Sequence, residues 1–291
     1  MADSTVPITF YDIAMRTPSL SCSPNPSKTR LALNFTSVPY KTIFVPLPSI
    51  PSVRQSLGVP AGRKFADGSD FHTLPVIVDE TTGAKVGDSF DIAIHLHERY
   101  ADANGGKGEL FPVLKDGQKL DFRTPSTAML IPLSEMSEAA RQERYVEYAT
   151  FNIHVDAAFT SHVLLTAHGL PFPPDTAEAA RAEFCKRAGV PSWDAFNVSG
   201  EARAKLKESL REMLGDLAKL FVRNENGPFI LGERPCYADF IVGGWLKMLS
   251  VCLPAAEWAE VKLWHGGVFG KVFDALTGYM EVKERAERTD L

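Results

Sequence analysis

The spacing of apolar residues changes along this chain of 291 residues. Up to about residue 100, short runs that alternate apolar and polar positions, as strands do, lie between runs with the period of a helix. Beyond residue 125 the apolar positions recur at helical spacing. We therefore predict a mixed α/β unit followed by an all-α unit.

The elements of the first half are predicted to follow one another in the order βαβ, irregular loop, ββα. They are a strand over residues 7–13, a helix over 28–35, a strand over 40–45, a proline-rich irregular segment with one helical turn near 53–57, a hairpin of strands 76–78 and 85–86, and a helix beginning at Asp88. This order is that of a thioredoxin-like domain.

The second half is predicted to be a helical bundle. The first helix carries an apolar stripe over residues 148–163 and continues to Gly169. It is followed by a short helix near 177–186, an amphipathic helix over 206–220 and a helix over 240–251. The last is apolar on nearly every side, which indicates a buried central helix followed by a turn. We expect residues 1–102 and 126–291 to form two domains, joined by a Gly-, Asp- and Lys-rich linker over 103–125.

Composition and charge narrow the range of partners and cellular locations expected for this protein. The formal net charge of −5 and the pI of about 5.8 argue against nucleic acid or an anionic membrane as the main partner. The most apolar stretch, residues 240–259, contains Lys247, Pro254 and Glu257, which favours a buried helix over a membrane span. The 4 cysteines have no paired spacing, which suits a reducing compartment. The N-terminus lacks a charged segment followed by an apolar run, so we expect no signal peptide and a cytoplasmic protein.

Histidines and acidic residues do not suggest a metal site. His95 and His97 are two apart on a predicted helix and therefore lie on different faces. His154, Asp156 and His162 lack compact ligand spacing as well. We expect no metal.

Leu74-Pro75 and Asp88-Ser89 form the first candidate binding site. A proline cannot donate to a sheet ladder, so Pro75 is placed at a strand start, and the Leu74-Pro75 bond is predicted to be cis. An extended peptide could pair with the backbone there. At a helix start, Asp88-Ser89 offers a carboxylate, a hydroxyl and free N–H groups for the charged end of such a peptide.

Several short motifs occur in a fixed order along the chain. They are Ser23-Pro24-Asn25 with Lys28-Thr29-Arg30-Leu31-Ala32-Leu33-Asn34, then Thr73-Leu74-Pro75-Val76-Ile77, Asp88-Ser89-Phe90-Asp91-Ile92-Ala93, Phe229-Ile230-Leu231-Gly232, Pro235-Cys236-Tyr237-Ala238-Asp239 and Trp264-His265-Gly266-Gly267. In this order the chain resembles a glutathione S-transferase over nearly its full length. The first two motifs and the last are most similar to the fungal etherase-like class, called FuA.

The resemblance implies a role for each residue of the site. Ser23, which alone would be an ordinary helix N-cap, hydrogen-bonds the sulfur of glutathione and favours the thiolate, which is the nucleophile. Leu74, followed by Pro75, pairs its backbone with the cysteinyl unit. Asp88 and Ser89 hold the γ-glutamyl end.

The resemblance also implies the activity and the partners. The chain is expected to be a homodimeric glutathione transferase that acts on hydrophobic or aromatic electrophiles, aryl ethers among them, in detoxification, with glutathione as co-substrate. Asn25 is a further candidate for glutathione binding. Lys41 and Arg63 are candidates for its glycine carboxylate.

Two other functions stay open. A non-catalytic ligandin would bind aromatic compounds in a cleft between the domains. A thioltransferase would use Cys22 to form a mixed disulfide with glutathione. Ser21 is another rival for the role of Ser23, but the family residue directly precedes a proline, which selects Ser23 over Cys22.

Cys236 and Asp239 resemble the family's capping box at the start of a buried helix. Cysteine stands where serine or threonine is usual, and its sulfur is a weak acceptor. We therefore expect a poorer cap, with a role in folding rather than in catalysis.

Overall fold

A four-stranded sheet forms the centre of the first half of the chain in the computed structural model, which describes residues 6–17, 19–103, 105–115, 118–125 and 129–283. The strands β1 (Ile8–Ile13), β2 (Tyr40–Val45), β5 (Val76–Asp79) and β6 (Ala84–Val86) lie in the order β2-β1-β5-β6. β1 pairs with β2 in parallel and with β5 antiparallel. These four strands confirm the predicted ones.

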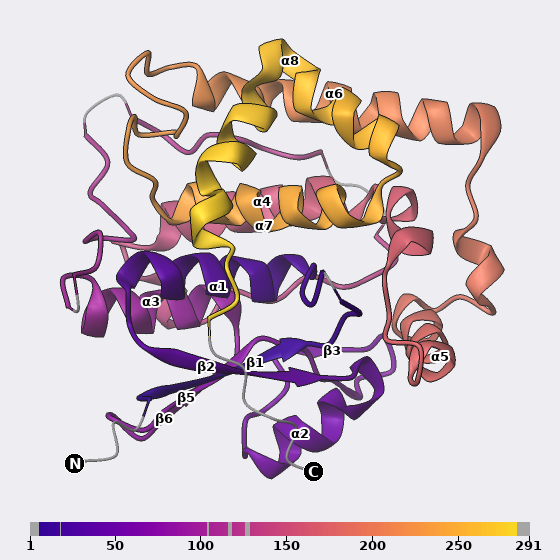
Figure 1. The fold of residues 1–291 in the computed structure, drawn as a ribbon, viewed down its shortest axis with the longest axis horizontal. Helices are drawn as coiled ribbons and strands as arrows, with labels where there is room; N and C mark the ends of the chain where they lie inside the picture. The colour runs from indigo at the N-terminus through magenta and orange to yellow at the C-terminus, as the bar shows by residue number, and fades with distance from the viewer. Residues whose placement is uncertain (1–5, 18, 104, 116–117, 126–128, 284–291) are drawn as a thin grey trace.

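Helices cover both faces of this sheet (Figure 1). α1 (Pro24–Thr36) and α3 (Ser89–Tyr100) lie on one face, and the short α2 (Ile50–Ser56) lies on the other. α1 begins earlier than predicted, at Pro24, because a proline in the first turn lacks only an N–H that would have no helical partner there. The arrangement is the predicted thioredoxin-like fold.

The segment expected to be irregular contains a second hairpin. β3 (Arg63–Lys64) and β4 (Asp70–Phe71) pair antiparallel, with Arg63 opposite Phe71. Strands of this length are too short for an alternating pattern to reveal them.

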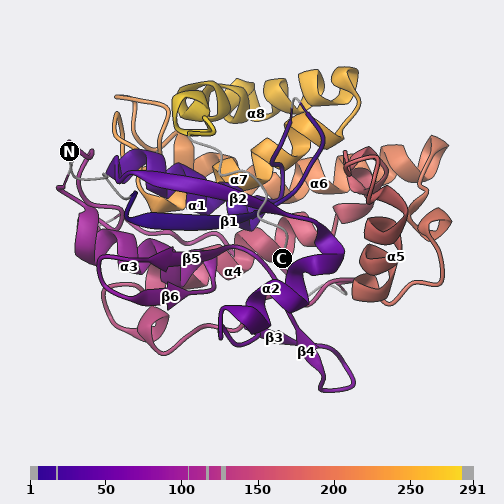
Figure 2. The ribbon, with the colours of Figure 1, turned by 60° about the horizontal axis from the view of Figure 1, so that its bottom comes forward.

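The second half of the chain is helical and lies on the α1 and α3 side of the sheet (Figures 1 and 2). Its helices are α4 (Val146–Thr160), α5 (Ala177–Ala188), α6 (Gly200–Phe221), α7 (Tyr237–Cys252) and α8 (Ala255–Leu276). α7 is buried along most of its length, as predicted. In the described part of the chain, none of the helices has both the length and the apolar character needed to cross a bilayer.

The expectation that the first helix of this half continues to Gly169 is wrong, because α4 ends at Thr160. Beyond it the side chains of Ser161 and His162 both bind the carbonyl oxygen of Ala158, at 2.9 and 2.7 Å. Side chains that take a backbone carbonyl in this way compete with the helical hydrogen bond. Short 3-10 turns replace the helix up to Gly169.

The pattern after residue 251 predicts a turn, whereas the structure contains the long helix α8. Residues 264–267 interrupt this helix, and His265, Gly266 and Gly267 have φ of 49°, 74° and 80°. These left-handed residues break the apolar period in the middle of the helix, so no continuous helical pattern is visible in the sequence.

The two halves of the chain meet where α1 lies against α7. A Cβ at Gly244 would stand 2.6 Å from the carbonyl oxygen of Pro24 and 2.9 Å from Cγ of Lys28, so only glycine permits this approach. At the start of α7, the Tyr237 hydroxyl donates to the carbonyl oxygen of Ser89 at 2.8 Å. The first turn of each site helix is therefore fixed against α7.

Asp239 anchors the start of α7. Its carboxylate accepts the backbone N–H groups of Cys236 (2.8 Å) and Ile230 (2.9 Å), and the side chain is fully buried. The predicted capping box is thus present, with the Cys236 side chain as its other half. The N–H groups of Cys236 and Ile230 would have no partner without the Asp239 side chain.

We predict that Asp239→Ala lowers the free energy of unfolding by about 2–5 kcal/mol, since two buried N–H groups each lose a charged acceptor. Urea denaturation measures this change. Asp216→Ala is the matched control, because Asp216 is exposed on α6 and pairs only with Lys219. It should change stability by less than about 0.5 kcal/mol. Equal losses in the two variants would contradict the role of Asp239.

Candidate functional site

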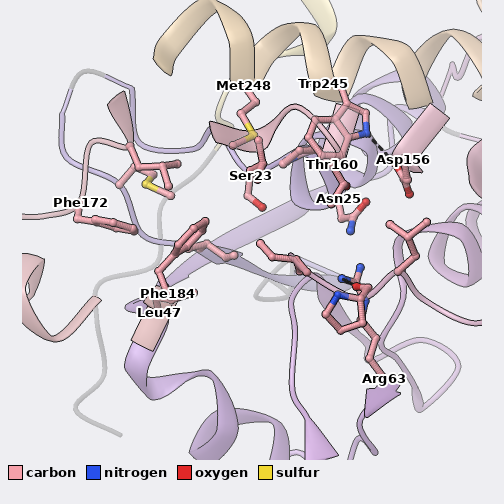
Figure 3. Close-up of a pocket in the computed structure, with 18 residues that line it drawn as sticks. Ser23, Asn25, Leu47, Arg63, Asp156, Thr160, Phe172, Phe184, Trp245 and Met248 are labelled. Carbon is pink, nitrogen blue, oxygen red and sulfur yellow. Dashed lines mark hydrogen bonds between the residues drawn. The ribbon is translucent and has the colours of Figure 1, made fainter. Parts of the chain in front are cut away.

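A cavity of about 150 Å³ lies between the two halves of the chain (Figure 3). It is bordered by the N-terminus of α1, by α4 and α7, and by loops from both halves. Most of its lining is apolar. The polar side chains are those of Ser23, Asn25, Arg63, Asp156 and Thr160.

Ser23 is the N-cap residue of α1, but its side chain does not cap the helix. The hydroxyl instead points into the cavity (Figure 3). The free N–H groups and the dipole at a helix N-terminus favour a negative charge at this place. Ser23 thus offers a hydrogen-bond donor where an anion is stabilised.

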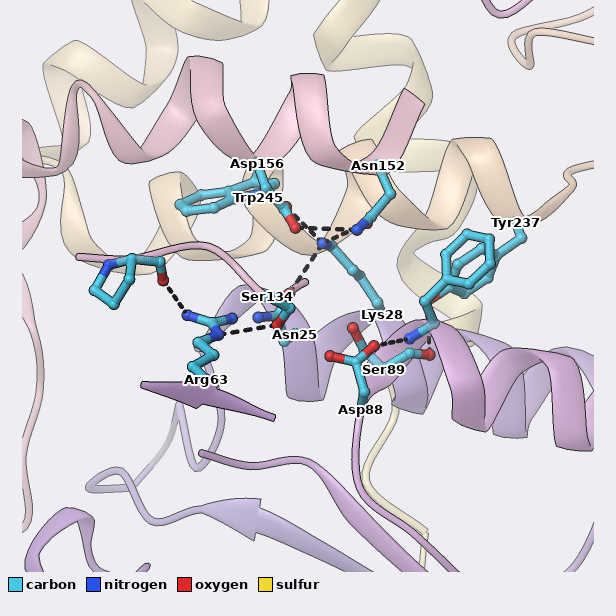
Figure 4. Close-up of polar contacts among 12 residues, drawn as sticks. Asn25, Lys28, Arg63, Asp88, Ser89, Ser134, Asn152, Asp156, Tyr237 and Trp245 are labelled. Atoms are coloured by element: carbon cyan, nitrogen blue, oxygen red, sulfur yellow. Dashed lines mark hydrogen bonds and ion pairs between the residues drawn. The ribbon is translucent and has the colours of Figure 1, made fainter. Parts of the chain in front are cut away.

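Asn25, in the first turn of α1, is held by a buried ammonium group (Figure 4). Lys28 Nζ lies 2.9 Å from Asn25 Oδ1, 2.9 Å from Asn152 Oδ1 and 2.6 Å from Asp156 Oδ1. Burial lowers the pKa of Lys28, and the neighbouring Asp156 carboxylate opposes this shift. These contacts tie α1 to α4 at the polar end of the cavity.

Aromatic rings form much of the remaining wall. Trp245 of α7 stacks on Phe159 of α4, with ring centroids 5.2 Å apart and an angle of 7° between the planes. Its indole N–H donates to Asp156 Oδ1 at 2.6 Å. Phe172 and Phe184 lie on the other side of the cavity (Figure 3). Such a wall fits an aromatic ligand.

Arg63 connects the cavity to residues 131–137, which we call the cover segment. Its guanidinium donates from Nε to Ser134 Oγ (2.9 Å) and from Nη1 to the carbonyl oxygen of Pro132 (2.8 Å). Burial lowers the pKa of Arg63, whereas the carboxylates of Asp88 and Asp156 act in the opposite direction. Lys41, the other candidate for the glycine carboxylate, is exposed on β2 and does not line the cavity.

Leu74-Pro75 and Asp88-Ser89 have the predicted local geometry. The Leu74-Pro75 bond is cis. Asp88 is the N-cap of α3 and accepts the N–H of Phe90 at 2.8 Å. Ser89 is the first residue of α3 and is 3% exposed.

A buried guanidinium orders both of these loops. Arg54 of α2 donates to the carbonyl oxygen of Thr73 (2.6 Å), directly before Leu74, and to that of Gly87 (3.0 Å), directly before Asp88. It also binds the carbonyl oxygen of Pro60. Burial lowers the pKa of Arg54 to about 10, so its charge is retained at neutral pH.

The structure does not gather all the predicted residues in one cavity. Ser23 and Asn25 line the main cavity, Asp88 lines a smaller one near Asn152, and Leu74, Pro75 and Ser89 line neither. The cover segment borders both cavities, with residues 131–133 at the first and 134–137 at the second. Ser137 fixes it further by donating to Asp91 Oδ1 at 2.5 Å.

Three charged residues of the site, Lys28, Asp156 and Arg54, were not predicted from the sequence. Lys28 occurs only within the motif that starts at Ser23, Asp156 appears only beside two histidines, and Arg54 falls in the proline-rich segment. A charged residue in a helical pattern normally indicates a solvated face. Most of their partners lie in other elements of the fold, and Asp156 follows Lys28 by 128 positions, so no local pattern reveals these contacts.

Cys22 lies outside the cavity lining. Its side chain is fully buried, with Sγ 3.9 Å from Sγ of Cys252. The contact with Cys252 and burial raise its pKa well above the usual value, which disfavours the reactive thiolate. Across the residues that the structure describes, no group of three or more His, Cys, Asp or Glu side chains is placed to hold a metal ion.

Comparisons with known proteins point to one family. Family models described as "Glutathione S-transferase, N-terminal domain" and "Glutathione S-transferase, C-terminal domain" match residues 22–99 and 149–279. The chain is 27% identical over 293 residues to the glutathione S-transferase-like protein ustS of Aspergillus flavus, covering 94% of this chain and 91% of that protein.

Two solved fungal structures are similar over nearly the whole chain. The glutathione S-transferase CsGST63524 of Ceriporiopsis subvermispora, in complex with glutathione, has 29% identity and a TM-score of 0.74, covering 95% of this chain and 98% of its own. The glutathione transferase GSTFuA2 of Phanerochaete chrysosporium has 26% identity and a TM-score of 0.70, covering 95% and 99%.

We predict that Arg63→Met loosens the cover segment, because Ser134 and Pro132 lose their charged donor. Hydrogen exchange of a peptide spanning residues 129–138, followed by mass spectrometry, should become about tenfold faster, equivalent to ~1.4 kcal/mol. Lys64→Met is the control, since Lys64 is exposed and pairs with Asp70. Unchanged exchange in Arg63→Met would show that other contacts hold the segment.

Proposed function

Because the chain belongs to the glutathione S-transferase family, we propose that it is a serine-type glutathione transferase whose bound glutathione thiolate attacks hydrophobic or aromatic electrophiles in detoxification. Residues 1–102 form the glutathione-binding domain, and residues 126–291 supply most of the second-substrate site. The glutathione complex of the C. subvermispora relative supports glutathione as the co-substrate. By analogy with the family, the enzyme acts in the cytoplasm as a homodimer.

One observation carries the proposal: the Ser23 hydroxyl points into an aromatic-walled cavity from the N-terminus of α1 and leaves the helix uncapped. A free thiol has a pKa of about 8.5 and is mostly protonated at neutral pH. A hydroxyl donor and a helix N-terminus both favour the thiolate, and each unit of lowered pKa corresponds to about 1.4 kcal/mol.

The chemical step is a nucleophilic displacement. The thiol proton leaves to solvent, and the sulfur attacks the electrophilic carbon with its electron pair to form a C–S bond. The leaving group departs with the electrons of the broken bond. For an aryl ether, which the etherase-like resemblance includes among the substrates, that bond is the C–O bond and the leaving group is a phenolate.

The remaining site residues bind the tripeptide. The backbone of Leu74, shaped by Pro75, pairs with the cysteinyl unit as a short added strand. Asp88 and Ser89 bind the γ-glutamyl end at the start of α3. Arg63 binds the glycine carboxylate, since its present acceptors, Pro132 and Ser134, are uncharged.

We predict that Ser23→Ala lowers turnover at neutral pH about ten- to a thousandfold, because ~1.4–4 kcal/mol of thiolate stabilisation is lost. The rate should partly recover at higher pH, where the thiolate forms unaided. The pH–rate profile with one aryl ether or isothiocyanate measures both effects. Ser21→Ala is the control, since Ser21 is buried and does not line the cavity.

An unchanged profile in Ser23→Ala would assign the sulfur contact to another donor. Binding of aromatic compounds without turnover in the unmodified protein would instead indicate a ligandin. Loss of thiol transfer in Cys22→Ala but not in Ser23→Ala would favour the thioltransferase.

We predict that Ser89→Ala weakens glutathione binding by about 1–3 kcal/mol, the usual cost of one hydrogen bond to a charged group. Calorimetric titration with glutathione measures the change in Kd. Ser52→Ala is the matched control, because Ser52 is exposed and bonds only within α2 and the turn before it. Equal affinity in the two variants would place the γ-glutamyl end elsewhere.

A further inference from the structure

We propose that Lys28 is a positioning residue that fixes the Asn25 amide as a second hydrogen-bond donor to the glutathione sulfur. The inference rests on the proposed function and adds one element to it. Lys28 does not touch the substrate but acts through Asn25 (Figure 4).

The argument begins with the hydrogen-bonding capacity of Lys28. An ammonium group has three donors and no acceptor. All three are used, because Nζ contacts Oδ1 of Asn25, Oδ1 of Asn152 and Oδ1 of Asp156 at 2.9, 2.9 and 2.6 Å. The side chain is fully buried, so water does not compete for these contacts.

This arrangement determines which end of the Asn25 amide faces the cavity. The end that contacts Lys28 must be the carbonyl oxygen, since an NH2 group cannot accept from an ammonium group. The NH2 group is therefore the end left for a ligand, and it is drawn on the cavity side in Figure 3. Ser23 and Asn25 both line that cavity. A thiolate beside them receives an O–H donor from one and N–H donors from the other.

The charge of Lys28 does not itself explain the thiolate. Asp156 lies 2.6 Å away and offsets that charge, so the pair adds little net field at the sulfur. The pair instead contributes a fixed orientation of the Asn25 amide. In addition, Asp156 is held by Trp245 (2.6 Å) and Asn152 (3.2 Å), so the acceptor that anchors Lys28 is itself immobile.

The test measures the pKa of the thiol of bound glutathione, from the ultraviolet absorbance of the thiolate, in the full-length protein. In Lys28→Met the Asn25 amide is free to rotate, and we expect this pKa to rise by about one unit, a tenfold loss of thiolate. The Kd for glutathione should change less than threefold. Lys247→Met is the control, because Lys247 is a half-buried lysine on α7 that does not line the cavity.

A double-mutant cycle with Asn25→Ala separates positioning from a general structural effect. If Lys28 acts through Asn25, Lys28→Met changes the thiol pKa in the unmodified protein but not in the Asn25→Ala background. Additive changes, or no change in Lys28→Met, would overturn the inference.

A third variant keeps the test open if Lys28→Met fails to fold. Asn25→Asp retains an acceptor for Lys28 but replaces the N–H donors by a carboxylate oxygen, and we expect the thiol pKa to rise by more than one unit. An unchanged pKa would contradict the inference. If Ser23→Ala also leaves this pKa unchanged, or if glutathione does not bind at all, the proposed function fails as well. A Ser23 effect without an Asn25 effect overturns the Lys28 inference alone.

Discussion

The burial of one ammonium group connects the fold to the site. Lys28 and Asp156 lie 128 residues apart in the chain, on α1 and α4, and their contact forms only when the two halves dock. Docking in turn depends on Gly244, since any side chain there would collide with the first turn of α1. Removing one partner of such a buried pair costs about 3–5 kcal/mol, because the other charge stays behind without compensation. The polar end of the cavity therefore exists only in the closed two-domain structure.

A second buried cation organises the other side of the site in a different way. Arg54 has backbone carbonyls as acceptors, so its position ties the loops before Leu74 and before Asp88 to α2. The two cations therefore order different parts of the site. Arg54 orders the backbone against which a peptide could pair, and Lys28 orders side chains at the start of α1. The charged groups of Lys28 and Arg54 are both buried, so dissolved salt screens their contacts little.

Local sequence patterns predict much of the fold, and the elements that they miss are missed for physical reasons. Alternation and helical period locate the four strands of the main sheet and α7, and the proline at position 75 predicts the cis bond. The two-residue strands β3 and β4 are too short to produce a pattern, and the left-handed residues within α8 interrupt one. Ser23 and Asn25 could be named from an ordered motif. Lys28, Arg54 and Asp156 could not, because the burial of each charge depends on at least one partner from a distant part of the chain.

The charges around the cavity favour a ligand that carries a carboxylate. Lys28 forms an ion pair with Asp156, whereas Arg63 donates its hydrogen bonds to a hydroxyl and a carbonyl oxygen, and the carboxylates of Asp88 and Asp156 act on it without a hydrogen bond. A guanidinium with neutral acceptors gains when a carboxylate replaces them, since charge-assisted hydrogen bonds are roughly twice as strong as neutral ones. In the proposed function, the glycine carboxylate of glutathione supplies that acceptor and displaces one contact of the cover segment, which Ser137 also holds through Asp91. If Arg63 binds the peptide carboxylate as proposed, binding weakens its contacts with residues 132 and 134, and the affinity for the peptide then includes the free energy of that change.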